Sequence, residues 1–199
     1  MKKRKYIQKR RAAQQEETRE RIVEAAVQLH EQLGPAATTV KAVAECAGVQ
    51  RLTVYRHFPD DERLFEACSS HWFGLNSPPA GDAWSELADP ADRTRTALLA
   101  FNRYYRKTQG MFASVYRDRE TVPALAPVLA AFDAFLDTTA NELATAWKPE
   151  TRSGAPLRAT LRHCLSFATW QSLAAQGLSD EKMTDLAMQW LSGVVAHTG

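Results

Sequence analysis

One short stretch of the sequence, residues 50–57, is unusually rich in side chains that could contact a nucleic acid. It reads QRLTVYRH, with two arginines, a glutamine, a threonine, a tyrosine and a histidine in eight positions. Arg51 could form a paired contact with a guanine, and Gln50 could read an adenine. Leu52 offers only apolar surface, which suits a thymine methyl group. This chemistry indicates base reading in a DNA groove.

Two short helices joined by a tight turn would hold these side chains. The hydroxyl of Thr38 or Thr39 can cap the first helix, and Gly48 can adopt the left-handed backbone angles that end it. The second helix begins near Gln50 and stops before Pro59. Its inward positions are apolar, so its polar side chains remain outside. The pattern predicts a helix-turn-helix with a recognition helix. The expected inward residues are Val49, Val54 and Phe58.

The stretch from Thr38 to Phe58 resembles the helix-turn-helix of the TetR family of bacterial transcriptional regulators. The resemblance rests on the segments TTV, AECAGV and TVYRHFPD, and extends from about Glu17 to about Leu64. It implies an all-α fold. An N-terminal three-helix DNA-binding domain would be followed by a helical ligand-binding and dimerisation domain.

The resemblance also implies roles for single residues. By similarity, the phosphate anchors of the recognition helix are Thr53, Tyr55, Arg56 and His57. Thr38, Thr39 and Lys41 could hold a further phosphate with backbone amides and side chains. Asp61 stands where many relatives have a phosphate-binding lysine, and Leu52 replaces a smaller residue. Asp61 predicts the loss of one phosphate contact, and Leu52 predicts a different base preference.

Charge is distributed unevenly along the 199 residues. Residues 1–60 contain 12 Lys or Arg against 7 Asp or Glu, whereas residues 61–199 contain 13 against 16. Seven basic residues lie within residues 1–11, a block that is typical of a disordered arm attracted to polyanions. We therefore expect a disordered basic arm at 1–15, a DNA-binding domain at 16–60 and a regulatory domain at 61–199. The arm would follow the DNA backbone or enter the minor groove; a solubilising tail is the alternative.

Apolar residues at helical spacing predict helices throughout the chain. Gly110 is expected to break one helix and Gly177 to end another. The expected helices lie near residues 16–33, 61–73, 89–109, 111–117, 127–147, 157–176 and 179–195. No series of strands is indicated.

The regulatory domain has no motif of comparable sharpness, so its expected sites follow from the resemblance. An apolar or aromatic effector pocket is expected among Trp72, Phe101, Tyr104, Tyr105, Phe112, Tyr116, Phe132, Phe135, Phe167 and Trp170. Tyr hydroxyls, Asn102 or His163 would supply its polar groups. The last two helices would form the homodimer interface through Leu157, Leu161, Cys164, Leu165, Met183, Leu186, Trp190, Leu191 and Val194. The alternatives are plain core residues in both cases.

Other classes of protein are disfavoured by what the sequence lacks. It contains no Gly-rich phosphate loop, GxSxG or HExxH segment, so we expect neither catalysis nor a cofactor. Its three cysteines form no CxxC pair, which argues against a disulfide framework or a zinc site. No apolar run is long enough to span a membrane, and a cytoplasmic location is expected. The expected partners are operator DNA, a second copy of the chain and a small-molecule effector. Control without an inducer, or activation instead of repression, remains the alternative.

Overall fold

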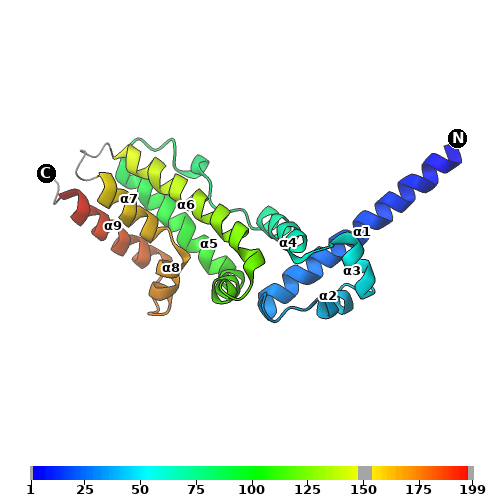
Figure 1. Cartoon of the computed structure of the whole chain (residues 1–199). Coiled ribbons are helices and arrows are strands. Elements are labelled where there is room, and N and C mark those ends of the chain that lie inside the picture. The colour runs from blue at the N-terminus through cyan, green and yellow to red at the C-terminus, as the bar shows by residue number, and fades with distance from the viewer. Residues whose placement is uncertain (1, 148–153, 197–199) are drawn as a thin grey trace. The chain divides into compact units, whose positions relative to one another are not determined.

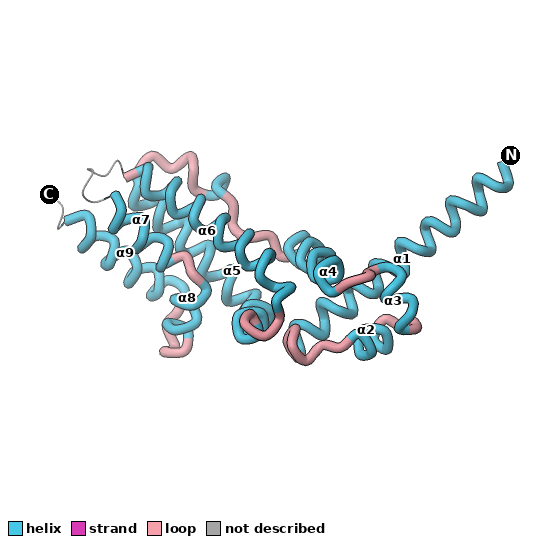
Figure 2. Tube along the Cα trace, viewed as in Figure 1, coloured by secondary structure: helices cyan, strands magenta, loops and turns pink. Residues whose placement is uncertain are grey.

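The computed structural model describes residues 2–147 and 154–196. Within these ranges the chain consists of helices joined by loops, and no strand occurs (Figure 2). The all-α prediction is therefore confirmed. The α-helices are α1 (Lys2–Gln32), α2 (Val40–Cys46), α3 (Arg51–His57), α4 (Asp61–Leu75), α5 (Pro90–Asp118), α6 (Ala126–Ala146), α7 (Gly154–Cys164), α8 (Phe167–Ala174) and α9 (Asp180–Ala196). Two short 3₁₀ helices, η1 (Gly81–Ala83) and η2 (Pro123–Leu125), lie in the connections.

The chain divides into two compact units. Unit 1 comprises residues 1–77 and 110–128, and unit 2 comprises residues 78–109 and 129–199. The expected boundary near residue 60 differs from this division. The difference arises because α4 packs against α1, and because the last turns of α5 also belong to unit 1.

Unit 1 is built around α1, which contacts both α2 and α4, while α2 also contacts α3 (Figure 1). Ile22 and Ala26 of α1 are fully buried, and Val43, Val54 and Phe58 are almost fully buried. Burial of a Val, Ile or Phe side chain contributes about 1.5–3 kcal/mol. The first helix therefore has the scaffolding role that its apolar stripe predicts.

The N-terminal arm differs from expectation. Instead of beginning near Glu16, α1 begins at Lys2, so residues predicted to be disordered are helical. The segment from residue 2 to residue 32 contains no Pro or Gly and is rich in Lys, Arg, Gln, Glu and Ala. These residues lose little freedom in a helix, and a folded helix that follows supplies the nucleus.

Two other helix boundaries were predicted wrongly. Gly110 does not break α5, because a single glycine costs a helix only about 1 kcal/mol. Conversely, the helix expected over 157–176 is divided into α7 and α8. Ser166 begins α8 with a side-chain cap, since its hydroxyl accepts a hydrogen bond from the backbone N–H of Thr169 at 3.2 Å. The cap makes a new helix start favourable at this point.

Unit 2 has a core of leucines and aromatic residues. Leu136, Leu157, Leu161 and Leu165 are fully buried. Polar contacts also link its helices, both inside the core and at its surface. The Asn102 amide donates to Thr184 Oγ1 of α9 at 3.0 Å, and Arg106 pairs with Asp180 at 2.8 Å. Arg162 of α7 pairs with Asp133 and Asp137 of α6.

Candidate nucleic-acid interface

The predicted helix-turn-helix is present as α2, a turn and α3. Thr39 caps α2, since its Oγ1 accepts a hydrogen bond from the Ala42 N–H at 3.1 Å. Gly48 has φ +65°, and the next N–H, that of Val49, donates to the carbonyl of Ala44 at 2.9 Å. This left-handed glycine turn ends α2 and sets the direction of α3. Gln50 precedes α3 but makes no side-chain capping bond.

The outer surface of α3 carries the side chains predicted to meet DNA. Val54 and the following Phe58 are buried, which orients the opposite side of the helix towards solvent. Arg51 and Arg56 are exposed, and Leu52 remains 58% exposed despite being apolar. An exposed leucine beside an exposed arginine suits a surface that reads a thymine methyl group and a guanine. Tyr55 is also exposed, whereas Thr53 and His57 are half-buried at the edge.

The start of α2 presents a second group of predicted contacts. Thr38 donates its hydroxyl hydrogen to the carbonyl of Gly34 at 2.8 Å, so it holds the preceding loop in place. Thr39 Oγ1 accepts the capping bond, and a hydroxyl group can also donate its own hydrogen, so Thr39 could bind a phosphate oxygen. Lys41 is exposed and has a long ion pair of 3.8 Å with Glu45, which a phosphate could replace.

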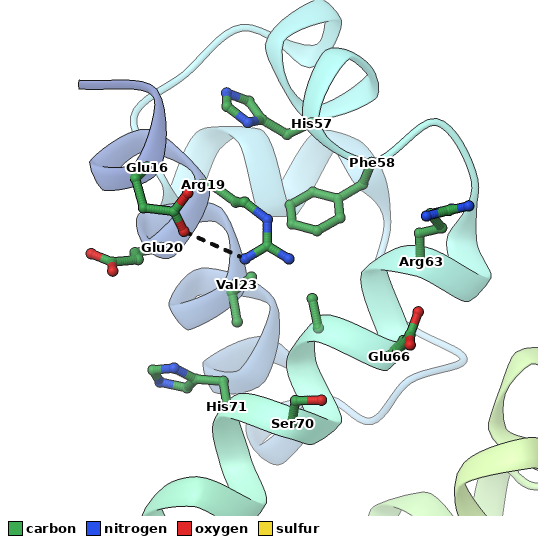
Figure 3. A pocket seen from close by; sticks show the side chains of 11 residues that line it. Glu16, Arg19, Glu20, Val23, His57, Phe58, Arg63, Glu66, Ser70 and His71 are labelled. Carbon is green, nitrogen blue, oxygen red and sulfur yellow. Dashed lines mark ion pairs between the residues drawn. The ribbon is translucent and has the colours of Figure 1, made fainter. Parts of the chain in front are cut away.

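The end of α3 is fixed to α1. The Arg19 guanidinium lies 5.1 Å from the centre of the Phe58 ring, a cation–π contact, and its Nη1 lies 3.7 Å from Glu16 (Figure 3). These residues border a groove of about 570 Å³ that also reaches His57 and His71. Arg19 thereby positions the last turn of the recognition helix relative to α1.

A second groove of about 680 Å³ lies between α1 and α3, and we call it the α1–α3 groove. From α3 it is lined by Thr53, Arg56 and His57, three of the four predicted phosphate anchors; Tyr55 is not in its lining. From α1 it is lined by Arg11, Gln14, Gln15, Glu16, Thr18 and Arg19. Sequence reasoning assigned no DNA contact to these α1 residues individually. Of these residues, only Arg11 lies in the basic block of residues 1–11, for which the sequence predicts contact with DNA.

The loop before α2 is held by the end of α5. The Asp118 carboxylate accepts a hydrogen bond from the Ala36 N–H at 2.9 Å and pairs with Arg117 at 2.8 Å. The Arg117 guanidinium in turn donates to the carbonyl of Leu33 at 3.1 Å. Hydrogen bonding from Arg117 is the main reason why the pKa of Asp118 lies below its ordinary value. These contacts place the loop that leads to Thr38 and Thr39.

A buried histidine completes this junction. His30 stacks on Phe65 of α4, with ring centres 4.9 Å apart and planes 5° from parallel. Burial lowers the pKa of His30 to about 4, so the ring is neutral near pH 7. The carbonyl of His30 accepts a hydrogen bond from the Ser114 hydroxyl at 3.0 Å. The end of α1 is thus joined to both α4 and α5 within unit 1.

The ten aromatic residues predicted to line one pocket belong to two units. Trp72, Phe112 and Tyr116 lie in unit 1, where Trp72 and Phe112 make an edge-to-face contact at 5.7 Å. The other seven lie in unit 2, where Phe167 packs edge-to-face on Tyr105 at 5.5 Å and stacks on Trp170 at 5.6 Å. Their packing on one another is the ordinary role of aromatic core residues.

Most of the proposed polar groups of that pocket already have partners within the chain. The Tyr105 hydroxyl donates to the carbonyl of Leu165 at 2.8 Å, and the Asn102 amide donates to Thr184. His163 is exposed and meets Thr169. Among described side chains, the buried nitrogen without a hydrogen-bond partner is Nε1 of Trp170. Sequence reasoning counted Trp170 only as apolar lining.

The predicted dimer-interface residues need a correction. Leu157, Leu161, Leu165 and Leu191 are fully buried within a single chain, and Cys164 and Met183 are almost so. They therefore cannot form a surface for a second copy. The apolar stripes of α7 and α9 face the core of unit 2, where burial removes their side chains from water. Trp190, Val194 and Leu186 are only half-buried.

The outer sides of α7 and α9 offer a different surface. A shallow groove of about 440 Å³ is lined by Ala159, Thr160, His163, Trp190 and Val194. The rings of His163 and Trp190 lie 6.2 Å apart. We call these five residues the α7–α9 groove. It combines apolar side chains with partial exposure, which buried core positions lack.

Comparison with known proteins identifies the helix-turn-helix. The sequence profile described as "Bacterial regulatory proteins, tetR family" matches residues 22–68, which contain α2 and α3 in full. This segment of the chain carries the sequence signature of the TetR family's helix-turn-helix. The resemblance noted from the TTV, AECAGV and TVYRHFPD segments is thereby confirmed.

Solved TetR-family structures share the fold over most of the chain. A TetR-like transcriptional regulator from Rhodococcus sp. RHA1 is 19% identical, with a TM-score of 0.62 over 90% of this chain and 96% of that one. The multidrug binding protein EbrR, in complex with imidazole, is 20% identical, with a TM-score of 0.60 over 89% of both chains. PfmR from Thermus thermophilus is 20% identical, with a TM-score of 0.58 over 88% of this chain and 94% of that one. At such identities the likeness concerns the fold.

A search of curated proteins finds no match to this chain. Across residues 2–147 and 154–196, no helix is long and apolar enough to cross a membrane. In the same ranges, no group of three or more His, Cys, Asp or Glu side chains is placed to hold a metal ion.

Proposed function

We propose that this protein is a homodimeric repressor of the TetR family that binds a palindromic DNA operator and is released from it by a small, apolar or aromatic ligand. The observation that carries the proposal is the exposed outer face of α3. Arg51 and Leu52 are adjacent in the sequence, and both side chains are exposed to solvent, whereas Val54 and Phe58 are buried. A short helix of this kind fits the major groove and supplies base-specific contacts.

Dimerisation has a physical motive and a candidate surface. One seven-residue helix reads few base pairs, whereas two helices related by a two-fold axis read both halves of a palindrome. The α7–α9 groove supplies partly exposed Trp190 and Val194 on α9 beside residues of α7. A two-fold axis would pair these helices with their copies and cover the apolar surface.

Ligand binding is supported by the aromatic interior of unit 2. The Trp170 indole N–H is buried without a partner among the described residues, and an unpaired buried donor costs about 1–3 kcal/mol. A ligand that presents one hydrogen-bond acceptor to this N–H would recover that cost. The neighbouring Tyr105 and Phe167 rings favour an aromatic or apolar ligand. The multidrug binding protein EbrR, which shares the fold, was crystallised with the heterocycle imidazole.

The proposal is tested with the purified full-length chain. Selection from a randomised duplex library should yield a palindrome, and sedimentation should give a dimer that binds one palindrome. A thermal-shift screen of aromatic compounds should then find ligands that stabilise the protein and release that DNA in a gel shift. Trp170→Phe should weaken the ligands that carry an acceptor. Absence of a selected sequence would refute DNA reading, and stabilising ligands that leave the complex intact would refute the inducer step.

A further inference from the structure

The first turns of α1 form an exposed basic helix. Every described side chain from residue 6 to residue 17 is exposed. The first turns of α1 project as a single helix (Figure 1). Its basic residues include Lys9, Arg10 and Arg11. Positive charge is unfavourable at the N-terminal end of a helix, and neighbouring basic residues repel one another. A polyanion alongside the helix would reverse both effects.

The exposed helix leads directly into the α1–α3 groove. Arg11 and Arg19 line one wall of this groove, and Arg56 and His57 of the recognition helix line the other. The single carboxylate in its lining is that of Glu16. Three arginines against one carboxylate give the groove a positive lining, which joins the basic surface of α3 to that of α1.

We propose that the basic N-terminal turns of α1 and the α1–α3 groove form a second DNA-backbone surface. It binds phosphates of the duplex that flanks the bases read by α3. This inference rests on the proposed function, because it assumes that α3 binds DNA. The segment from Lys2 to Gln15 is about 21 Å long at 1.5 Å per residue, which corresponds to about six base-pair steps. The contact extends the bound region without adding base specificity.

Duplex DNA fits this surface better than a lipid bilayer does. A helix that lies in a membrane surface needs a continuous apolar stripe opposite its charges. In this segment the large apolar side chains are Tyr6 and Ile7, which are adjacent in sequence and set among basic residues on both sides. Lys9, Arg10 and Arg11 follow one another in the sequence, so helical geometry spreads their charges over more than one side of the helix, as suits a rod that lies between phosphates.

The test compares a triple variant, K9Q/R10Q/R11Q, with a matched control, K107Q/R158Q/K182Q. The control removes the same charge from exposed positions of unit 2. Binding is measured from about 0.05 to about 0.5 M salt on the duplex selected by the wild-type protein, with and without about eight flanking base pairs. Loss of three phosphate contacts should reduce the magnitude of the salt slope by about 2.7. At about 0.15 M salt the affinity for flanked DNA should fall about 10- to 100-fold.

Footprinting, salt dependence and vesicle binding together test whether this surface binds the DNA backbone. Hydroxyl-radical footprinting should show protected flanking backbone with wild-type and control protein, and loss of that protection with the triple variant. Preference for the selected sequence over random DNA should stay the same, because α3 is intact. Equal salt slopes for the triple variant and the wild type would overturn the inference, although wild-type selection of a sequence would still support the proposed function. Strong binding of phosphatidylglycerol vesicles that requires Lys9, Arg10 and Arg11, with an unchanged DNA footprint, would overturn it in favour of a membrane.

The helical form of the surface has its own test. Ala13→Pro keeps every charge but interrupts the helix between the basic turns and the rest of α1. If a rigid helix places the charges, this variant should lose the flanking footprint while circular dichroism shows that the remaining helices are intact. A full footprint with Ala13→Pro would show a flexible tail and would refute the helical contact.

Discussion

The carboxylate of Asp118, in the last turn of α5, accepts a 2.9 Å hydrogen bond from the backbone N–H of Ala36, 82 positions earlier in the chain. Ala36 lies in the loop that leads into α2, so one side chain of α5 fixes the entry to the helix-turn-helix. Arg117 strengthens the arrangement by pairing with the same carboxylate and with the carbonyl of Leu33. Residues 110–118 of α5 therefore act as part of the DNA-binding unit.

Removal of this carboxylate should destabilise unit 1. Asp118→Ala leaves the Ala36 N–H and the Arg117 guanidinium without their partner, and loss of such a bond costs about 1–3 kcal/mol. The free energy of unfolding, measured with urea, should fall by that amount, and operator affinity should fall with it. Glu120→Ala is the control, because the Glu120 side chain is 83% exposed. Equal effects of both substitutions would contradict the role assigned to Asp118.

Gly34 and Gly48 provide a matched pair of glycine substitutions. Both have positive φ, +92° and +65°, so alanine at either position pays about 1–2 kcal/mol in backbone strain. A Cβ on Gly34 would also collide with the Arg117 guanidinium and lie 2.5 Å from Asp118 Oδ2, whereas a Cβ on Gly48 meets nothing within 4 Å. Thermal unfolding should therefore show Gly34→Ala to be clearly the less stable variant. A smaller loss for Gly34→Ala than for Gly48→Ala would refute the close packing at Gly34.

Arg51 and Arg56 should differ in how they contribute to DNA binding. Arg51→Ala should lose about 1–3 kcal/mol of discrimination between operator and random DNA, because it removes a base contact. Arg56→Ala should weaken binding to both DNAs alike and reduce the salt slope by about 0.9, because it removes a phosphate contact. Quantitative gel shifts at several salt concentrations separate the two effects. Equal losses on both DNAs for Arg51→Ala would make Arg51 a phosphate anchor.

His30 should make unit 1 sensitive to acid. Its pKa is about 4 in the folded chain against 6.5 as the ordinary value, so the unfolded chain binds more protons between these pH values. The free energy of unfolding is therefore unaffected by His30 above about pH 6.5. As the pH falls from there towards about 4, protonation of His30 in the unfolded chain lowers the free energy of unfolding by about 3 kcal/mol. His30→Phe removes the titration and should flatten the dependence of the free energy of unfolding on pH over this range. An unchanged slope would show that other groups cause it.

The α7–α9 groove should control dimerisation. Val194→Glu places a charge beside Trp190 at the proposed interface, where it would be buried without a partner. Sedimentation should show a folded monomer that has lost most of its affinity for the palindrome. Gln171→Glu introduces the same charge at an exposed position of α8 and should leave the dimer intact. A stable Val194→Glu dimer would place the interface elsewhere.

The sequence by itself determined the helix-turn-helix, because its signals are local. A threonine cap of α2 (Thr38 or Thr39 from the sequence, Thr39 in the structure), Gly48 at the turn, and the buried Val54 and Phe58 all follow from residues close to one another in the chain. Short-range capping, turn geometry and helical spacing need no knowledge of the rest of the chain. The exposed side of α3 follows from the same pattern.

Tertiary structure decided the features that depend on packing between distant segments. Periodicity groups Leu157 with Leu161 on one side of a helix, but only the fold shows that this side faces the core, while Ala159 and His163 face outward. The same holds for the division of the aromatic residues between two units and for the bond from Asp118 to Ala36. The spacing of apolar residues shows which side of a helix is apolar. Whether the chain's own core or a second copy covers that side depends on packing between segments that are distant in the sequence.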